Sequence, residues 1–209
     1  MRAFPVMLDL RGKLAVVVGA GPVGLRKAKS LVKADARVRL VAERVKASGP
    51  MDGVEVLKQP YGAGVLEEAF LVFACTDDAA LNSRIAEDAR RAGALVNVAD
   101  TPDECDFYLP ATTGDGDVIV AIGTGGASPG LAAWLKRRLT AELPDRIGEF
   151  AVLLNELRGG LKTQLPDVSA RMAIMRDMAD DETYGRFVQA GPQAVREKLQ
   201  ALLSAQRDR

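Results

Sequence analysis

A glycine pattern near the N-terminus constrains the fold of this chain more than any other feature. Gly19, Gly21 and Gly24 have the spacing G-x-G-x-x-G and directly follow the apolar run Leu14–Val18. A short run of this kind, rich in β-branched residues, is typical of a buried parallel strand. Apolar residues then recur at helical spacing. The order strand, glycine turn, helix predicts the first βαβ unit of a Rossmann fold, with a dinucleotide pyrophosphate at the helix N-terminus.

Further apolar segments extend this pattern into a sheet. We predict strands at Val38–Ala42, Val54–Leu57, Leu71–Thr76 and Leu95–Ala99. Helical segments separate strands of this series, as expected for βαβ units in a parallel sheet.

The pattern changes near residue 107. Phe107–Ala111 and Val118–Ile122 predict two strands around a turn, and Ser128-Pro129 predicts the start of a helix. After Asp145 the chain is expected to be entirely helical, with a first helix that ends at Gly159-Gly160.

A middle helix of this region should present an apolar stripe to its core. The stripe consists of Val168, Met172 and Met175, and we expect these residues to be core side chains.

Composition excludes several classes of function. The chain has no histidine, which excludes a Ser-His-Asp triad, a histidine metal site and a histidine base. Its 28 Lys and Arg balance 28 Asp and Glu, which argues against general binding to nucleic acid or anionic membranes. No apolar run is long enough to span a membrane, and two cysteines cannot build a Cys-based zinc site. We expect a cytoplasmic protein without a resident metal, a nucleic-acid partner or a membrane partner.

The end of the second strand indicates which dinucleotide is bound. Glu43 lies 19 residues after Gly24, where an acid holds the adenosine ribose and would repel a 2′-phosphate. We therefore expect NAD rather than NADP. The neighbouring Arg44 leaves the alternative open, since arginine is the residue that accommodates a 2′-phosphate.

Polar residues at the ends of the fourth and fifth strands complete the candidate site. Ligands of open parallel sheets bind at the carboxyl ends of the strands. Thr76 is expected to meet the cofactor, and Asn97 and Asp100 should lie near the nicotinamide. Asp100 is the best-placed candidate acid or base, although a carboxylate there is also a common turn cap.

A second glycine-rich turn precedes the helix of the strand–turn–strand region. It has the sequence GTGGASP over residues 123–129, with three basic residues within the next turns. Its hydroxyl and N–H groups could bind an anion, or Ser128 could simply cap the helix. The pattern alone favours neither interpretation.

Five segments occur in an order that resembles a known family. They are FPVMLDL (residues 4–10), VVVGAGPVGLRKA (16–28), ACTDD (74–78), VNVADTPDECDFYLPA (96–111) and GTGGASPGLA (123–132). Together they resemble the precorrin-2 dehydrogenase and sirohydrochlorin ferrochelatase family, which is the N-terminal module of siroheme synthase. The resemblance covers roughly residues 3–145.

The resemblance implies a fold and an activity. The fold would be an NAD-binding Rossmann domain (1–112), a small α+β dimerisation region (113–145) and a C-terminal helical domain (146–209). The family reaction dehydrogenates precorrin-2 to sirohydrochlorin in siroheme biosynthesis with NAD⁺ as hydride acceptor. Some relatives also insert iron. The expected partners are the tetrapyrrole and a second copy of the chain.

The resemblance also assigns residues. Asp100 matches the key aspartate of the family. Besides the three glycines, the positions that match cofactor contacts are Pro22, Val23, Glu43 and Arg44. Thr124, Gly125 and Ser128 match the second glycine turn and would contact substrate.

Two other interpretations compete with this one. The chain could be a non-catalytic NAD-sensing module, which would leave Asp100 and the second glycine turn without a role. It could also be a dehydrogenase for another small substrate. That activity would need a catalytic Lys, Tyr or His near the nicotinamide, and the sequence has no histidine and no clear Tyr-Lys pair.

Overall fold

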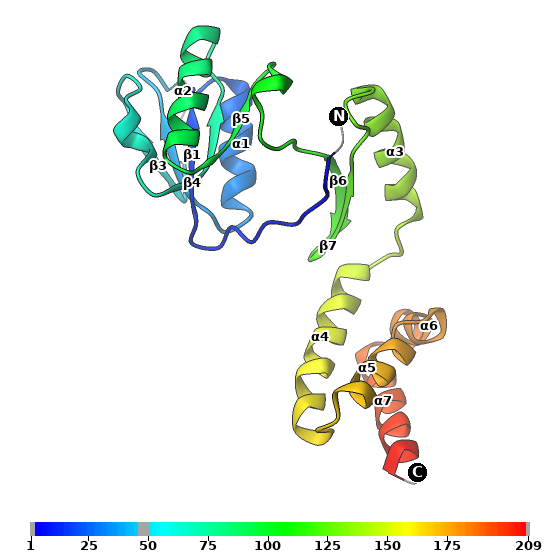
Figure 1. The fold of residues 1–209 in the computed structure, drawn as a ribbon. Helices are drawn as coiled ribbons and strands as arrows, with labels where there is room; N and C mark the ends of the chain where they lie inside the picture. The colour runs from blue at the N-terminus through cyan, green and yellow to red at the C-terminus, as the bar shows by residue number, and fades with distance from the viewer. Residues whose placement is uncertain (1–2, 46–50, 208–209) are drawn as a thin grey trace. The chain divides into compact units, whose positions relative to one another are not determined.

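The computed structural model describes residues 3–45 and 51–207 (Figure 1). The chain divides into two compact units, which part between Leu109 and Pro110. The finer division into three domains, with boundaries after residues 112 and 145, stays a prediction.

The first unit is built on a parallel sheet of five strands in the order β3-β2-β1-β4-β5. The strands are β1 (Leu14–Val18), β2 (Arg37–Val41), β3 (Val54–Leu57), β4 (Ala69–Ala74) and β5 (Leu95–Val98). All neighbouring strands pair in parallel, with β1 at the centre between β2 and β4. The predicted Rossmann-type sheet is confirmed.

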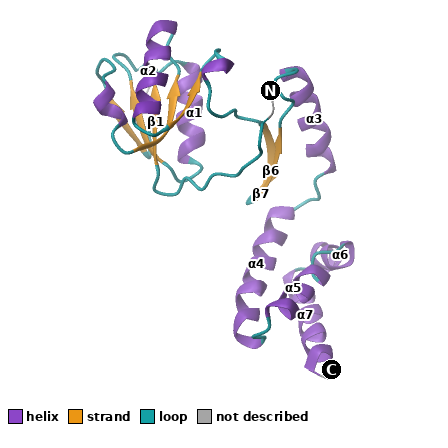
Figure 2. Ribbon diagram, in the orientation of Figure 1, coloured by secondary structure: helices purple, strands orange, loops and turns teal. Residues whose placement is uncertain are grey.

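Two helices cover the two faces of this sheet (Figure 2). Helix α1 (Pro22–Val32) packs on the face that carries Val17 and Phe73, and helix α2 (Ala79–Arg91) packs on the face that carries Val16 and Val72. Because side chains alternate along a strand, a fully apolar run such as Leu14–Val18 supplies both cores at once. Two short 3₁₀ helices, Ala63–Leu66 and Pro102–Glu104, lie in the connections.

The second unit begins with a β-hairpin that differs from the predicted one. Strands β6 (Ala111–Asp115) and β7 (Val118–Ile122) pair antiparallel, so the first strand is not Phe107–Ala111. Asp115 pairs with Val118, so a two-residue turn closes the hairpin. Gly116 in this turn has a φ of 54°, the positive value that tight hairpin turns require. Phe107 instead packs edge-to-face against Phe73 of the sheet, with ring centroids 5.5 Å apart. Tertiary packing therefore decided which apolar residues form the strand.

Helix α3 (Pro129–Glu142) follows the hairpin and precedes four further helices. These are α4 (Ile147–Gln164), α5 (Val168–Asp177), α6 (Asp181–Ala190) and α7 (Pro192–Arg207). Their shared core is formed by Phe150, Leu153, Leu157, Leu161, Ile174, Met178, Phe187, Val195, Leu199 and Leu203.

One expectation about these helices was wrong, and another was confirmed only in part. Helix α4 continues through Gly159-Gly160, because Leu161 is buried and holds the last turn in the core. Of the predicted stripe, Met175 packs against the core, whereas Val168 and Met172 are exposed, Met172 by 69%. The core-facing side of α5 carries the buried Ile174 and shares only Met175 with the stripe that the apolar spacing indicated.

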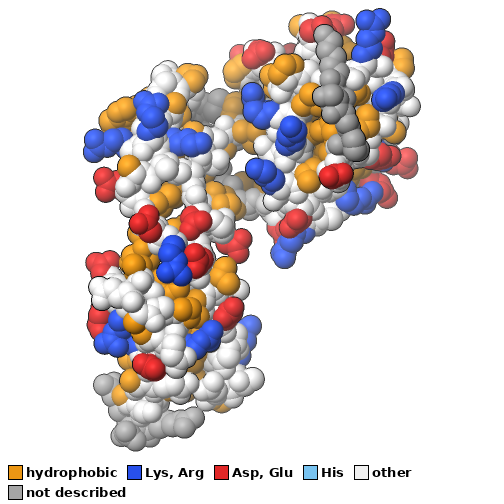
Figure 3. Space-filling view, turned by 180° about the vertical axis from the view of Figure 1, so that it is seen from behind, with side chains coloured by type: hydrophobic (Ala, Val, Ile, Leu, Met, Phe, Trp, Pro, Cys, Tyr) orange, Lys and Arg blue, Asp and Glu red, His pale blue; other side chains and the backbone are white. Residues whose placement is uncertain are grey.

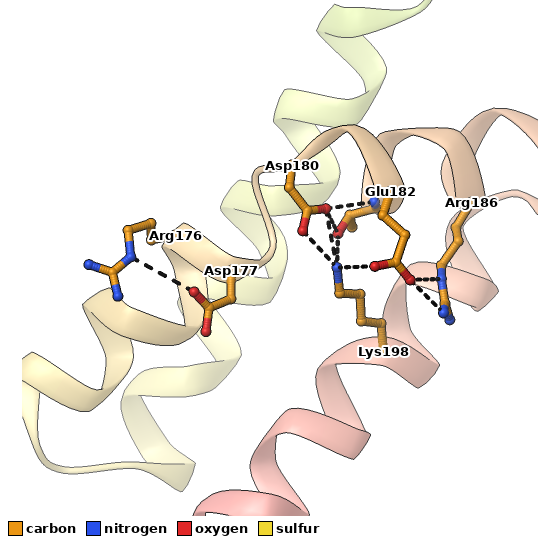
Figure 4. A network of polar contacts seen from close by, with 7 residues as sticks. Arg176, Asp177, Asp180, Glu182, Arg186 and Lys198 are labelled. Carbon is orange, nitrogen blue, oxygen red and sulfur yellow. Dashed lines mark hydrogen bonds and ion pairs between the residues drawn. The ribbon is translucent and has the colours of Figure 1, made fainter.

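A network of polar contacts joins α6 to α7 (Figure 4). The Asp180 carboxylate caps α6 by accepting a hydrogen bond from the Thr183 N–H at 2.7 Å. The Lys198 ammonium donates to both Asp180 oxygens at 3.1 Å and to the Thr183 hydroxyl at 2.6 Å. Hydrogen bonds from Thr183, and then from Lys198, lower the pKa of Asp180 to about 2. The charged end of Lys198 is thus fully paired.

The surface carries charges of both signs. Lys and Arg side chains alternate with Asp and Glu over the face drawn in Figure 3. Among the described residues, no helix combines the length and the apolar character that crossing a bilayer requires.

Candidate cofactor and active site

The first glycine turn is shaped by two backbone contacts that only glycine allows. Gly19 has a φ of 104°, and a Cβ there would collide with the Cys75 carbonyl. A Cβ on Gly24 would collide with the Gly19 carbonyl. The Gly19 N–H donates to the Val41 carbonyl at 2.9 Å. These contacts fix the turn against the ends of β2 and β4.

The middle glycine differs from its two neighbours. Gly21 is the N-cap of α1 with an ordinary φ of −72°, and no described atom lies within 4 Å of a Cβ built there. No side chain caps the helix, and its first turn carries no acid. Pro22 and Val23 are exposed. The positive end of the helix dipole therefore faces a space in which a phosphate group is stabilised.

The segment after β4 is held by a buried amide that the sequence analysis missed. Asn82 is 5% exposed, and its side chain accepts from the Thr76 N–H at 3.1 Å and from the Thr76 hydroxyl at 2.7 Å. Its amide also donates to the Thr76 carbonyl at 3.1 Å. Thr76 is thereby fixed at the carboxyl edge of the sheet. The only signal in the sequence was a polar residue on the inner face of α2.

The segment after β5 presents Asp100 to solvent. Asp100 is exposed and adopts a φ of 62°, in the left-handed region that few residues other than glycine occupy. Asn97 is partly buried, and its amide donates to the Phe107 carbonyl at 2.9 Å. Asn97 therefore orders this edge, while the Asp100 carboxylate remains available for chemistry.

The Asp100 carboxylate influences the end of β4. Burial raises the pKa of Cys75 to about 11, Lys27 opposes this effect, and Asp100 adds to it. Strands β4 and β5 are paired neighbours in the sheet, with Ala74 opposite Val98. Cys75 follows β4 and Asp100 follows β5, as neighbouring strands of a parallel sheet require.

Glu43 and Arg44 are placed after β2, at the same edge of the sheet. Both are exposed, and neither forms an ion pair with another described residue. Residues 46–50, which come soon after them, lie outside the described part of the chain.

The second glycine turn belongs to the second unit. The Ser128 hydroxyl caps α3 by accepting from the Leu131 N–H at 3.3 Å. The Thr124 hydroxyl donates to the Ser128 carbonyl at 3.4 Å, and Gly125 has a φ of 61°. The predicted helix start is confirmed. Anion binding there stays a prediction.

No three His, Cys, Asp or Glu side chains gather into a metal-binding group anywhere in residues 3–45 and 51–207. The candidate site consists of backbone amides, the ribose-binding candidate Glu43 and the exposed carboxylate of Asp100.

The parallel sheet and its glycine turn define a dinucleotide-binding protein of the Rossmann class. The chain belongs to the family described as "Putative NAD(P)-binding", which matches residues 6–111.

Curated relatives agree with the resemblance seen in the sequence motifs. The siroheme synthase of Actinobacillus pleuropneumoniae serotype 7 (strain AP76) is 33% identical over 193 residues, which are 90% of this chain and 40% of that protein. The siroheme synthase of Pseudomonas aeruginosa (strain LESB58) is 34% identical over 203 residues, 95% of this chain and 43% of that protein. The chain thus spans about two fifths of the length of these relatives.

A solved structure shares the fold over nearly the whole chain. The structure titled "SirC, precorrin-2 dehydrogenase" has a TM-score of 0.75 and 23% sequence identity, and the match covers 95% of this chain and 100% of that one. The predicted order of a Rossmann-type sheet, a small α+β region and C-terminal helices is confirmed.

Proposed function

We propose that this protein is an NAD-dependent precorrin-2 dehydrogenase that forms sirohydrochlorin in siroheme biosynthesis. The observation that carries the proposal is the exposed Asp100 carboxylate at the same sheet edge as the glycine turn. Similarity to siroheme synthases over at least 90% of the chain supports the substrate class. The proposal includes a cytoplasmic location.

The cofactor would be held by residues whose geometry suits it. The backbone N–H groups of Gly21 and Val23 and the helix dipole would face the pyrophosphate, with Pro22, which has no N–H to donate, in contact with it, and Glu43 would accept from the adenosine ribose. Thr76 and Asn97 would border the nicotinamide half. NAD⁺ supplies the hydride-accepting ring when it is bound.

Asp100 would act as the base of the reaction. Dehydrogenation removes a hydride and a proton from precorrin-2, and the carboxylate would accept the proton while the hydride leaves. No histidine exists that could take this role. Thr124, Gly125 and Ser128 are proposed to contact the tetrapyrrole.

Anaerobic incubation of the protein with precorrin-2 and NAD⁺ tests the function. Sirohydrochlorin and NADH should form in equal amounts and only when both reactants are present. NAD⁺ binding without turnover would support the sensing module instead. Iron or cobalt added after the first step tests whether the chain also inserts a metal.

The protein should bind NAD⁺ more tightly than NADP⁺. Glu43 follows β2 and is exposed, so its charge would repel a 2′-phosphate. Calorimetric titration with both cofactors measures the preference. Tighter binding of NADP⁺ would overturn the expectation and assign the 2′-phosphate to Arg44.

The protein should form a homodimer. None of the residues of α3, all of which are described, is buried, and Trp134 and Leu131 are 48% and 44% exposed. Ile119 of the hairpin is 56% exposed. A second copy that covers these side chains would remove them from water. Light scattering at micromolar concentration should give twice the chain mass, and Trp134→Glu should shift the mass toward the monomer. A monomeric parent protein would contradict this expectation.

A further inference from the structure

Helix α1 carries several basic residues and no acidic one, and one of its lysines differs from the rest. Arg26 and Lys29 are exposed, whereas Lys27 is partly buried. The Lys27 ammonium lies 5.7 Å from the ring centroid of Phe73, the penultimate residue of β4. The side chain of Lys27 therefore points toward the carboxyl end of β4 and is only partly exposed to solvent.

This ammonium has no anionic partner in the described residues. The side chain of Lys27 forms no ion pair and no hydrogen bond with residues 3–45 or 51–207. Lys198, which is also partly buried, contacts two oxygens of Asp180 and the Thr183 hydroxyl. A partly buried charge without a partner is costly, and the ring of Phe73 offsets only part of that cost. Burial lowers the pKa of Lys27, as expected for an ammonium that lacks a counter-ion.

The Lys27 ammonium lies beside β4, the strand that pairs with β5. Cys75 follows β4, and the Cys105 thiol accepts a hydrogen bond from the Val98 N–H at 3.2 Å, at the end of β5. Lys27 and Asp100 both influence Cys75. Phe73, under the ammonium, pairs with Asn97 of β5, and Asp100 follows the end of that strand, so the ammonium and the candidate base share the carboxyl edge of β4 and β5.

We propose that Lys27 is a positioning residue that binds a carboxylate of the tetrapyrrole substrate and so orients it toward Asp100. This inference rests on the proposed function. Precorrin-2 carries acetate and propionate side chains, and an ammonium pairs with such a group through charge-assisted hydrogen bonds. The pyrophosphate is the other anion expected at this edge. It is better placed at the helix N-terminus beside Gly21, whereas Lys27 reaches toward β4.

Steady-state kinetics of Lys27→Met tests the proposal. The variant keeps the apolar stem of the side chain and removes only the charge. The KM for precorrin-2 should rise about 10- to 100-fold, the effect of losing a hydrogen bond to a charged group, while the Kd for NAD⁺ stays within about twofold. Lys27→Arg should restore much of the substrate affinity. Lys29→Met, which removes an exposed charge from the same helix, should behave like the parent.

Each other outcome has a defined meaning. An unchanged KM in a folded Lys27→Met variant overturns the proposal. A weaker Kd for NAD⁺ with an unchanged KM also overturns it and assigns the ammonium to the pyrophosphate. If Lys27→Met does not fold, the same comparison is made with Lys27→Gln. If neither folds, the ammonium is structural and the proposal falls.

The failure of the proposed function would be seen separately. If the parent protein does not oxidise precorrin-2, titration of NAD⁺-loaded parent and variant with sirohydrochlorin replaces the kinetics. Binding to the parent that weakens at least tenfold in Lys27→Met supports the carboxylate site without any turnover. Equal binding to both proteins, or none to the parent, overturns it.

Discussion

Replacing Asp100 with alanine is expected to lower precorrin-2 dehydrogenation about 10²–10⁴-fold, the usual effect of losing a general acid or base. The carboxylate is exposed, lies on a left-handed turn after β5, and has no histidine to replace it. NAD⁺ affinity should change little, because the glycine turn follows a different strand. Single-turnover rates with precorrin-2, together with an NAD⁺ titration, measure the two effects separately.

Asp100→Asn is the matched control for this experiment. Asparagine tolerates the left-handed region as aspartate does, so it keeps the turn and removes the base. It should lose activity as alanine does. A folded Asp100→Ala variant that binds NAD⁺ and turns over within about threefold of the parent would make Asp100 a turn residue only. The proton would then pass to water or to the substrate's own carboxylates. If metal insertion is present and is lost together with dehydrogenation, one site serves both steps.

Replacing Gly19 with alanine is expected to destabilise the first unit by about 2–5 kcal/mol. A positive φ costs a residue with a Cβ about 1–2 kcal/mol, and forcing atoms into a packed position costs about 1–3 kcal/mol more. Both terms apply, since Gly19 has a φ of 104° and its Cβ would meet the Cys75 carbonyl. This loss is a large part of the stability of a typical domain.

Urea unfolding followed by circular dichroism measures the loss in Gly19→Ala. Tryptophan fluorescence would miss it, because the single tryptophan, Trp134, belongs to the second unit. Gly21→Ala is the control, since a Cβ at Gly21 has no described neighbour within 4 Å and φ is ordinary. It should keep the parent stability and weaken NAD⁺ binding at least tenfold. Parent-like stability in Gly19→Ala would contradict the argument.

Local sequence signals predicted the first unit well. The run Leu14–Val18 and the three glycines identify a strand, a turn and a helix within a few residues, because the residue types that form these elements follow one another directly in the sequence. The wrong predictions lie where tertiary packing decides. Phe107 is apolar enough for a strand but packs on Phe73, and Leu161 holds α4 beyond Gly159-Gly160.

The candidate site was predictable only in part. Asp100 and Thr76 could be predicted as site residues because each follows the carboxyl end of a predicted strand, and these ends lie together at one edge of a parallel sheet. The buried amide of Asn82 and the inward ammonium of Lys27 were missed. A polar residue on a helix is usually a solvated one, and burial depends on which neighbour it meets in the folded chain.

The cores of the two units share no residue. The sheet is stabilised by side chains from its own strands and from α1 and α2, while α4 to α7 enclose a separate set. Heating should therefore melt the chain in more than one step, so that no single melting temperature describes it. A dinucleotide bound at the glycine turn would delay melting of the sheet by mass action and leave the helical step nearly unmoved. If the first unit melts first, the helices α4 to α7 persist after the cofactor site is lost. If the helices melt first, the cofactor site outlasts them.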